Sequence, residues 1–434
     1  MKTVGGKWSN WSGNVRFKPS AIIEPKDEID LAIAIRKTEG HLRFPGSGHS
    51  FAPLNQTDGS LIDLSAFVGL KGFDPQREVA SIAAATPLWG LGSLLHPLGY
   101  ALKSMPDIDR QTLGGAVATG THGSGLTLGS LSADVASFRL MLPTGEIVHC
   151  SPEENADIYA AGRLSLGLLG VLTEIDMKVQ PAYKLQRTFF RHPVQELFRQ
   201  LDGLVHANRN LSFFWFPHSE VAVCRSLNET ECQAPTRHSA RTLFTRGERR
   251  RVDEYVLSAV AETLRYMPGM LKPAHRFFAA TMFKRQKVRW SHEIYPAART
   301  VRYVAMEYAV PYERGAEAMQ EVAEAIRKSK ILMPLPLIYR TVAADDVWLS
   351  PFCDRTSATI SVNQYAKMDS ERLFSMCETI LRRYGGRPHW GKIHSATRNE
   401  LAELYPHFED FCALRRKLDP QGKFLNDHLG PLFA

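Results

Sequence analysis

The chain has 434 residues, more than one compact core accommodates, and its 44% apolar and 23% charged residues are typical of a folded protein of two domains. Its net charge of +8 is small for this length and is weak evidence for a nucleic-acid partner. The six cysteines show no metal-ligand spacing, the first residues lack the apolar core of a signal peptide and no run is long enough to cross a bilayer, so we expect a cytoplasmic protein without a metal site.

Residues 21–180 alternate between short strands and helices, which is typical of a mixed α/β domain. The first predicted helix, 27–40, has apolar residues at i, i+3 and i+4 spacing, opens with acidic residues and ends at Gly40. Residues 136–150 predict a β-hairpin around a Pro-Thr-Gly turn. The other expected elements are strands at 21–25, 41–45, 60–65 and 79–85, a helix at 87–99, and an apolar segment running into a strand at 164–181.

Two glycine-dense loops interrupt this domain, at 43–51 (RFPGSGHSF) and 114–125 (GGAVATGTHGSG). Glycine lets the backbone approach a ligand closely, and successive N–H groups form a cradle for anions such as a pyrophosphate. Neither loop matches the P-loop or the G-x-G-x-x-G fingerprint, so those nucleotide-binding folds are not indicated. Each loop carries a histidine, His49 and His122, whose ring would project from a tight turn toward the bound group. The alternative is that both loops are plain turns and both histidines are structural.

From residue 181 onward the composition changes, because aromatic residues and arginines become more frequent and the helical patterns lengthen. We expect a second domain to begin there, with helices at 254–267 and 314–329. Two basic stretches lie in this part, at 246–251 and 284–289. We interpret them as solvated helix faces; a nucleic-acid patch, a site for an acidic or phosphorylated substrate and an anionic membrane surface are the alternatives.

Six motifs occur in order along nearly the whole chain: NWSGNVRF, PGSGHSF, ATGTHGSG, LGLLGVLTEI, RPHWGKIHS and DPQGKFLNDHL. In these motifs the sequence resembles the vanillyl-alcohol-oxidase-type (PCMH-type) FAD flavoproteins, and more closely their branch of sugar-1,4-lactone oxidases and alditol oxidases. The resemblance implies an α+β fold with a two-subdomain FAD-binding domain over 1–180. It also implies a substrate-binding cap domain over 181–410, with an antiparallel sheet flanked by helices, and a C-terminal segment over 411–434 that returns to the FAD domain.

The resemblance also assigns residues to the cofactor. It implies that His49 bonds covalently to the 8α-methyl carbon of FAD, where the imidazole nitrogen withdraws electron density and raises the flavin potential. The glycine loops would line the pyrophosphate, and Gly170 with Val171 would lie against the adenine and ribose. The expected cofactor-binding residues are Pro45, Gly46, Ser47, Gly48, His49, Ser50, Pro106, Thr112, Gly115, Thr119, Thr121, His122, Gly123, Ser124, Gly170, Val171, Lys392, Asn426 and His428.

For the reaction itself, the resemblance points to Lys392, Arg340 and Thr112 as catalytic residues. Asn363 joins the arginine and the lysine as an expected substrate ligand. A cation at the lysine position would stabilise the reduced, anionic flavin. Many relatives carry a glutamate two residues before this arginine, where the chain has Ile338, so the usual hydroxyl-binding carboxylate is missing from that position.

These features predict an FAD-dependent oxidase of a sugar-like alcohol, such as an alditol, an aldonolactone or a related carbohydrate. A hydride would pass from the carbinol C–H to flavin N5, and O2 would reoxidise the flavin to give hydrogen peroxide. Gly114, expected near the oxygen-reacting carbon of the flavin, would leave a path for O2. One alternative is a dehydrogenase of the same fold that passes electrons to a quinone or a cytochrome. Another is a basic binding protein without enzymatic activity.

Overall fold

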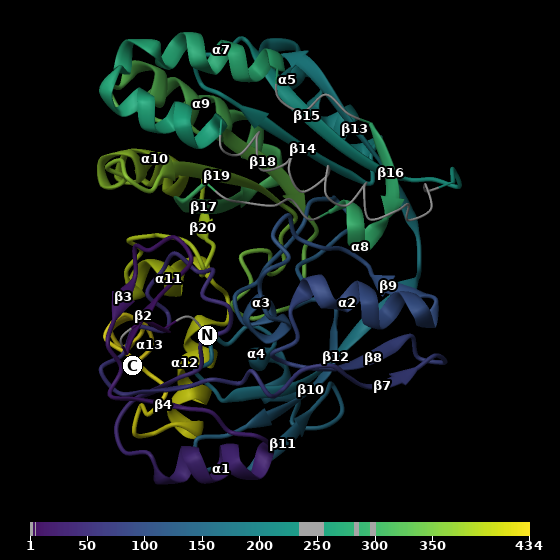
Figure 1. Ribbon diagram of the computed structural model, residues 1–434, viewed down its shortest axis with the longest axis vertical. Coiled ribbons are helices and arrows are strands. Elements are labelled where there is room, and N and C mark those ends of the chain that lie inside the picture. Colours follow the sequence, from purple (N-terminus) through teal and green to yellow (C-terminus); the bar gives the residue numbers. More distant parts are fainter. Residues whose placement is uncertain (1–2, 5, 234–255, 282–285, 296–300) are drawn as a thin grey trace.

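The computed structural model describes residues 3–4, 6–233, 256–281, 286–295 and 301–434. The basic stretch at 246–251 and the start of the one at 284–289 lie outside the described residues. Figure 1 shows two bodies: a lower one that contains both chain termini, and an upper one built on a large sheet that carries helices. The predicted α+β class is confirmed, because the lower body mixes helices with sheets and the upper one is a helix-covered sheet.

The larger sheet of the lower body has six strands in the order β11-β10-β12-β8-β7, with β9 paired to the end of β12. Its pairings are antiparallel, and the predicted hairpin at 136–150 is formed by β10 and β11. Gly145 in the hairpin turn has a φ of 76°, a left-handed conformation that suits glycine. The strands are β7 (Leu70–Asp74), β8 (Val79–Ala83), β9 (Tyr100–Leu102), β10 (Val135–Met141), β11 (Ile147–Cys150) and β12 (Val171–Pro181).

A small parallel sheet, ordered β4-β6-β5, forms the second part of the lower body. Helix α1 (Glu28–Lys37) connects its first two strands in the chain and confirms the helix predicted at 27–40. The helix begins at Asp27, whose side chain accepts the N–H of Asp30, and it carries basic residues in its last turn. The strands are β4 (Ala21–Ile23), β5 (Leu42–Arg43) and β6 (Ser60–Ile62); a third sheet, at the N-terminus, contains β1 (Thr3–Val4), β2 (Lys7–Ser9) and β3 (Arg16–Phe17).

Three short helices complete the part of the lower body that precedes the upper one. The helix predicted at 87–99 is confirmed as α2 (Leu88–Leu95) followed by the 3-10 turn η1 (His96–Leu98). Helix α3 (Leu113–Val117) lies in the second glycine-dense loop and is capped by the Thr112 side chain, which accepts the N–H of Gly115. Helix α4 (Ala156–Gly162) precedes β12.

The upper body is an eight-stranded sheet in the order β16-β13-β15-β14-β18-β19-β17-β20. All its pairings are antiparallel, as the predicted cap domain requires. The strands are β13 (Lys184–Pro193), β14 (Asn210–Trp215), β15 (Val221–Glu229), β16 (Lys287–Trp290), β17 (Tyr303–Pro311), β18 (Leu337–Val342), β19 (Ser357–Tyr365) and β20 (Arg387–Pro388).

Helices cover the outer face of this sheet, so that its inner face is turned toward the lower body (Figure 1). The predicted helix at 314–329 is confirmed by α9, whose buried residues recur at helical spacing and pack on β19. The chain is also helical over 256–266, within the predicted 254–267. The other helical elements are α5 (Val194–His206), η2 (Pro268–Met270), α7 (Leu271–Thr281), α8 (Ser291–Ile294), η3 (Tyr312–Arg314), α9 (Gly315–Lys328) and α10 (Glu371–Arg383).

After β20 the chain packs into the core of the lower body. Trp390, Tyr405 and Phe433 are buried in the same apolar cluster as the strands of the six-stranded sheet. Helices α11 (Arg398–Leu404), α12 (Phe408–Leu418) and α13 (Gly430–Phe433) belong to this segment. The domain limits at 180/181 and 410/411 stay predictions. None of the described helices has both the length and the apolar character that a bilayer crossing requires.

Candidate active site

A cavity lies between the inner face of the cap sheet and the lower body. Its wall brings together residues from both glycine loops, the cap strands β17, β18 and β19, and the segment after β20. Nine of the predicted site residues line it: His49, Ser50, Pro106, Thr119, Thr121, His122, Arg340, Asn363 and Lys392.

The N-terminal motif NWSGN and the later motif HWGK hold the loop that carries His49. The Asn10 amide donates to the Ser50 carbonyl over 2.9 Å. From the other side, the Phe51 N–H donates to the Gly391 carbonyl over 2.8 Å. The backbone neighbours of the histidine are therefore held by Asn10 and Gly391, which are 381 residues apart in the sequence and come together at this loop only in the folded chain.

His49 itself is held as a neutral imidazole. Its ring stacks on Trp11 with ring centroids 5.7 Å apart. Burial lowers its pKa to about 4, and the positive charges of Lys392, Arg302 and Arg110 act in the same direction. At neutral pH the ring therefore keeps an unprotonated nitrogen, which is the nucleophilic form.

Two glycines permit close approach where the loops meet. A Cβ on Gly46 would lie 2.5 Å from the Thr112 hydroxyl oxygen, and a Cβ on Gly123 would lie 2.6 Å from the Ser104 hydroxyl oxygen. Within the part of the chain that the structure describes, His428 Nε2 is buried without a hydrogen-bond partner. The two glycines therefore let protein segments pack closely, and the buried, unpartnered Nε2 of His428 is the atom here that fits a polar bound cofactor.

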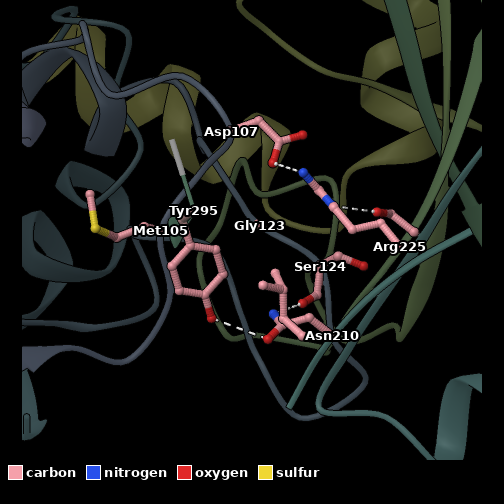
Figure 2. A pocket seen from close by; sticks show the side chains of 9 residues that line it. Met105, Asp107, Gly123, Ser124, Asn210, Arg225 and Tyr295 are labelled. Carbon is pink, nitrogen blue, oxygen red and sulfur yellow. Dashed lines mark hydrogen bonds and ion pairs between the residues drawn. The ribbon is translucent and has the colours of Figure 1, made fainter. Parts of the chain in front are cut away.

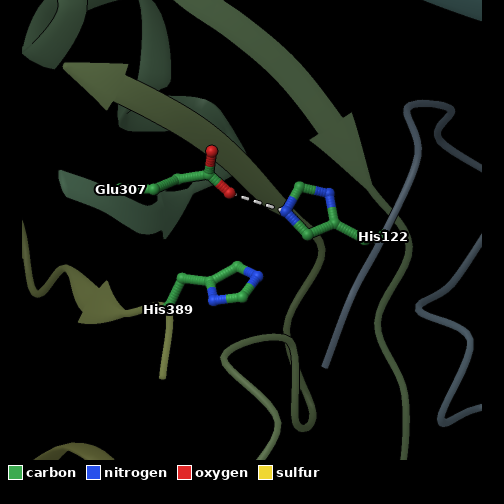
Figure 3. Close-up of side chains that lie close together, drawn as sticks. All are labelled: His122, Glu307 and His389. Atoms are coloured by element: carbon green, nitrogen blue, oxygen red, sulfur yellow. Dashed lines mark hydrogen bonds and ion pairs between the residues drawn. The ribbon is translucent and has the colours of Figure 1, made fainter. Parts of the chain in front are cut away.

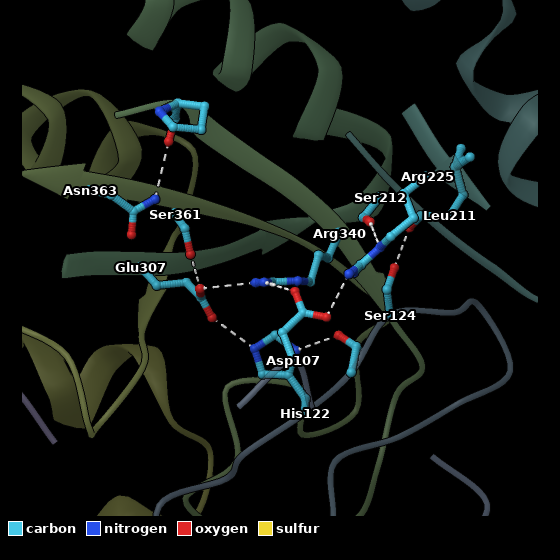
Figure 4. A network of polar contacts seen from close by, with 12 residues as sticks. Asp107, His122, Ser124, Leu211, Ser212, Arg225, Glu307, Arg340, Ser361 and Asn363 are labelled. Atoms are coloured by element: carbon cyan, nitrogen blue, oxygen red, sulfur yellow. Dashed lines mark hydrogen bonds and ion pairs between the residues drawn. The ribbon is translucent and has the colours of Figure 1, made fainter. Parts of the chain in front are cut away.

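Arg340 lies at the centre of the cavity wall contributed by β18. Its Nη2 donates to Asp107 over 2.9 Å, and its Nη1 lies 3.5 Å from Glu307 Oε2 (Figure 4). Burial alone would lower the pKa of this guanidinium, but the two carboxylates outweigh it and raise the pKa above the usual value. Arg340 is therefore a buried cation with two carboxylate partners, not an exposed surface charge.

Asp107 joins a second arginine to this network. Its Oδ1 pairs with Arg225 Nη1 over 2.8 Å, and Arg225 Nε donates to the Ser212 hydroxyl over 3.1 Å (Figure 2). The carboxylate and both guanidinium groups are largely buried, with side-chain exposures of 9%, 8% and 13% for Asp107, Arg225 and Arg340. A carboxylate of the lower body thus lies between two cations of the cap sheet.

Glu307, which faces Arg340, also lies beside two histidines, His122 and His389 (Figure 3). His122 Nε2 lies 2.7 Å from Glu307 Oε1, and His122 Nδ1 lies 2.9 Å from the Gly123 carbonyl. Burial by itself raises the pKa of the glutamate, but His122, with Lys392 and His389, holds it well below the usual value. The carboxylate is therefore ionised throughout the physiological range.

His389, which lies beside Glu307, is a neutral imidazole whose Nε2 is available as a hydrogen-bond donor. The Gly391 N–H donates to its Nδ1 over 3.0 Å, which places the ring proton on Nε2. Burial lowers its pKa to about 3. His122, Glu307 and His389 have the donor types of a metal site, but the guanidinium of Arg340 on the same carboxylate opposes a bound cation.

The cap sheet supplies a carboxylate, that of Glu307, close to Ile338, the position at which the expected glutamate is missing. Ile338 on β18 lies opposite Ser361 on β19, and Ser361 lies opposite Glu307 on β17. The Ser361 hydroxyl donates to Glu307 Oε2, and all three side chains line the cavity. The side of the wall with Ile338 is apolar, and the acidic group stands two strands away.

Lys392 and Asn363 also line the cavity. The Lys392 ammonium lies 4.8 Å from the centre of the Phe51 ring. The Asn363 amide donates to the Pro336 carbonyl over 3.1 Å, so its amide orientation is fixed with respect to β18.

Several predicted residues, all in the described part of the chain, lie outside the lining of this cavity. Thr112 caps α3 through its hydroxyl, and Gly115 is its partner. Asn426 donates to three carbonyls of the segment that follows His49 and therefore supports the loop from behind. The others are Pro45, Gly46, Ser47, Gly48, Gly123, Ser124, Gly170, Val171 and His428; Gly123 and Ser124 border the smaller cavity beside Asp107.

Four residues of the network were not predicted from the sequence: Asp107, Arg225, Glu307 and His389. Glu307 and Arg225 carry a signal that could have indicated them. Glu307 is the single charged residue of β17, YVAMEYAVP, and Arg225 is the single charged residue in the mostly apolar first part of β15, VAVCRSL. A buried charge requires a partner, so such a residue is a candidate for a site. Asp107, in an irregular segment, carries no comparable signal.

Two family models match the chain. The FAD binding domain model matches residues 19–151, and the D-arabinono-1,4-lactone oxidase model matches residues 175–431. The fold is similar to that of a cholesterol oxidase from Brevibacterium sterolicum, with a TM-score of 0.81 at 16% identity over 99% of this chain and 97% of the other.

Curated relatives match over nearly their full length. An L-gulono-1,4-lactone dehydrogenase of Mycobacterium tuberculosis is 34% identical over 98% of this chain and 99% of the relative. An L-gulonolactone oxidase of Bos taurus is 30% identical over 99% and 98%, and an alditol oxidase of a Streptomyces species is 27% identical over 98% of both. The chain therefore belongs to the D-arabinono-1,4-lactone oxidase family and is an FAD-dependent oxidoreductase.

Proposed function

We propose that the chain oxidises a carbinol group of an uncharged sugar lactone or sugar alcohol, with FAD tethered to His49 and with O2 as the electron acceptor. The observation that carries the proposal is the cavity between the two bodies, whose lining brings His49 and Lys392 together with Arg340 and its carboxylate partners. The names of the relatives support this substrate class.

FAD supplies the hydride acceptor, and the residues of the chain bind and orient the substrate. Arg340 and Asn363 would donate to substrate oxygens from the cap side. Lys392 would place a positive charge where negative charge accumulates during the reaction.

The charges around Arg340 favour an uncharged group at this part of the cavity wall. Arg340 is already paired with Asp107 and Glu307, so its cation is balanced before any ligand arrives. The ammonium of Lys392 is a further cation in the cavity lining, and its charge also acts on Glu307. We therefore propose an uncharged sugar group for the part of the cavity beside Arg340.

His49 fits the role of a covalent anchor because it is a neutral imidazole fixed in a loop that borders the cavity. In forming the tether it would exchange its N–H and one C–H of the flavin methyl group for an N–C bond, and O2 would remove the two electrons that this exchange leaves behind. Acid precipitation of the purified protein tests the bond. A yellow pellet that fluoresces in a denaturing gel supports it, and a colourless pellet under a yellow supernatant contradicts it.

A screen for peroxide release over alditols, aldonolactones and amino sugars tests the substrate class. We expect turnover with aldonolactones or alditols, and activity confined to acidic sugars would contradict the proposal. The dehydrogenase alternative is separated by reducing the flavin with substrate without air and then admitting air. Reduced flavin that persists for minutes would rule out the oxidase.

Gly114 does not decide between these acceptors. A Cβ at this position would lie 3.1 Å from both Cβ and the carbonyl oxygen of Ala84, and the Gly114 N–H donates to that carbonyl over 2.7 Å. The close packing of α3 on the end of β8 thus accounts for the glycine without an oxygen path.

A further inference from the structure

The arginines that flank Asp107 are held at a fixed spacing by the cap sheet. Arg225 on β15 lies opposite Ser212 on β14, and Ser212 lies opposite Arg340 on β18. Side chains directly opposite one another project from the same face of a sheet, so both guanidinium groups point toward the lower body. Two strand spacings separate them, a distance of about 10 Å.

Asp107 arrives from the other body and fills the space between these cations. One carboxylate oxygen pairs with each arginine, over 2.8 and 2.9 Å (Figure 4). Like charges so close together and so well buried would repel each other strongly without this anion. The pairing also fixes the plane of the Arg340 guanidinium, because Nη2 is held by Asp107 while Nη1 faces Glu307.

The charges of this group add up to zero. Arg225 and Arg340 contribute two positive charges, and Asp107 and Glu307 contribute two negative ones. Asp107, Glu307 and Arg340 line the cavity, whereas Arg225 stands behind them and lines the smaller cavity. Replacing one of the two carboxylates by an amide would leave an uncompensated cation at the cavity wall.

We propose that Asp107 is a positioning and selectivity residue, which orients Arg340 and cancels its charge so that the cavity wall at Arg340 favours an uncharged sugar group over a carboxylate. The discrimination concerns a lactone and the open-chain acid formed from it by hydrolysis, which differ in charge but share most of their hydroxyl groups. This proposal rests on the proposed function for the identity of the sugar. The charge balance itself does not depend on it.

The test uses the flavin-loaded protein and acetate as a carboxylate probe that is independent of the substrate. Binding is followed through the flavin absorbance and by calorimetry, without turnover. Asp107→Asn should bind acetate about tenfold more tightly than the unmodified protein, because one positive charge is left unbalanced. Asp410→Asn is the control, since it makes the same change at an exposed position of α12 outside the cavity lining, and it should leave acetate binding unchanged.

The double variant Asp107→Asn with Arg225→Gln restores neutrality without restoring the carboxylate. It should reverse most of the gain in acetate affinity, whereas the KM for the sugar should stay raised because Arg340 is no longer held in place. A merely destabilised protein would not bind an anion more tightly. Unchanged acetate affinity in Asp107→Asn, or a gain that the double variant retains, would overturn the proposal.

Arg225→Gln alone keeps the proposal testable if Asp107→Asn does not fold. It leaves an excess negative charge at Asp107 and should weaken acetate binding, and a stronger interaction with acetate would contradict the charge argument. The lactone and its open-chain acid are titrated in parallel as competing ligands. If the unmodified protein binds neither sugar, the proposed function fails, while the acetate results still decide the role of Asp107.

Discussion

Glu307 carries a negative charge inside the protein because its neighbours make the ionised form the stable one. His122, Arg340 and Ser361 all contact its carboxylate, and these contacts more than offset the cost of burial. Neutralising this carboxylate costs free energy, because the buried guanidinium of Arg340 would keep its positive charge with one counter-charge fewer.

We therefore expect Glu307→Gln to reduce kcat/KM by about 10- to 100-fold and to lower the melting temperature, because a buried ion pair loses one partner. Steady-state kinetics and thermal unfolding measure the two effects. Glu324→Gln is the control, since this residue lies on the exposed side of α9 and pairs with neighbouring cations in solvent. Equal kinetics in Glu307→Gln and the unmodified protein would contradict a role in the site.

His49→Ala should abolish the covalent tether while FAD can still bind in the cavity. We expect the flavin to be released completely by acid and the midpoint potential of bound flavin to fall, because the electron-withdrawing imidazole is lost. Denaturing gels and redox titration measure these changes. His41→Ala, at an exposed position of the same segment, should keep the flavin attached. Flavin that remains acid-stable in His49→Ala would show that another residue forms the bond.

At the scale of elements, the first glycine loop and the start of α3 are packed together at one point. The Thr112 hydroxyl caps the helix and stands where a Cβ on Gly46 would lie. The two positions are therefore coupled, and a change at one should alter the effect of a change at the other.

Gly46→Ala should lower both flavin content and melting temperature, since a Cβ would lie only 2.5 Å from the Thr112 hydroxyl oxygen. Combined with Thr112→Ala, which removes that oxygen at a cost of about 1 kcal/mol for the lost cap, the damage should be less than the sum of the two changes. Gly90→Ala in α2, where a Cβ meets nothing within 4 Å, serves as the control. Additive effects would contradict the coupling.

For the whole molecule, buried histidines make stability depend on pH. Burial lowers the pKa of His275 and His394 to about 4 and that of His389 to about 3. Between pH 6.5 and these values these histidines bind protons in the unfolded chain but not in the folded chain. The free energy of unfolding therefore has its full value above pH 6.5 and decreases as the pH falls.

His275→Gln should reduce this pH dependence. His275 donates from Nε2 to the Met333 carbonyl in the cap and lies outside the lining of the cavity between the two bodies. In the unmodified protein the lowered pKa of His275 contributes roughly 2 kcal/mol to the free energy of unfolding at pH 7, and this contribution is lost by pH 4.5. Thermal unfolding at pH 7 and pH 4.5 should show a smaller difference for the variant. An unchanged difference would mean that other groups control the acid sensitivity.

Much of the fold could be predicted because local patterns are sufficient for it. The apolar spacing and the charges of α1, the hairpin turn around Gly145 and the helical pattern of α9 each depend on residues close together in the chain. The glycine loops and His49 were recognised for the same reason, since their motifs are continuous stretches of sequence.

The network around Arg340 could not be predicted in this way, because its members come from separate segments. Asp107 belongs to an irregular segment of the lower body, Arg225 to β15 and Glu307 to β17. Only strand order and register bring Ile338, Ser361 and Glu307 into one row, and only the docking of the two bodies places Asp107 between two arginines.

The sequence by itself determined the family, the two glycine loops and the position of His49, because each is written in a short run of residues. The tertiary structure decided where the carboxylates stand and how the charges of the cavity balance. The physical reason is that a buried charge is stable only beside its partners, and those partners are chosen by strand register and by the contact between the two bodies.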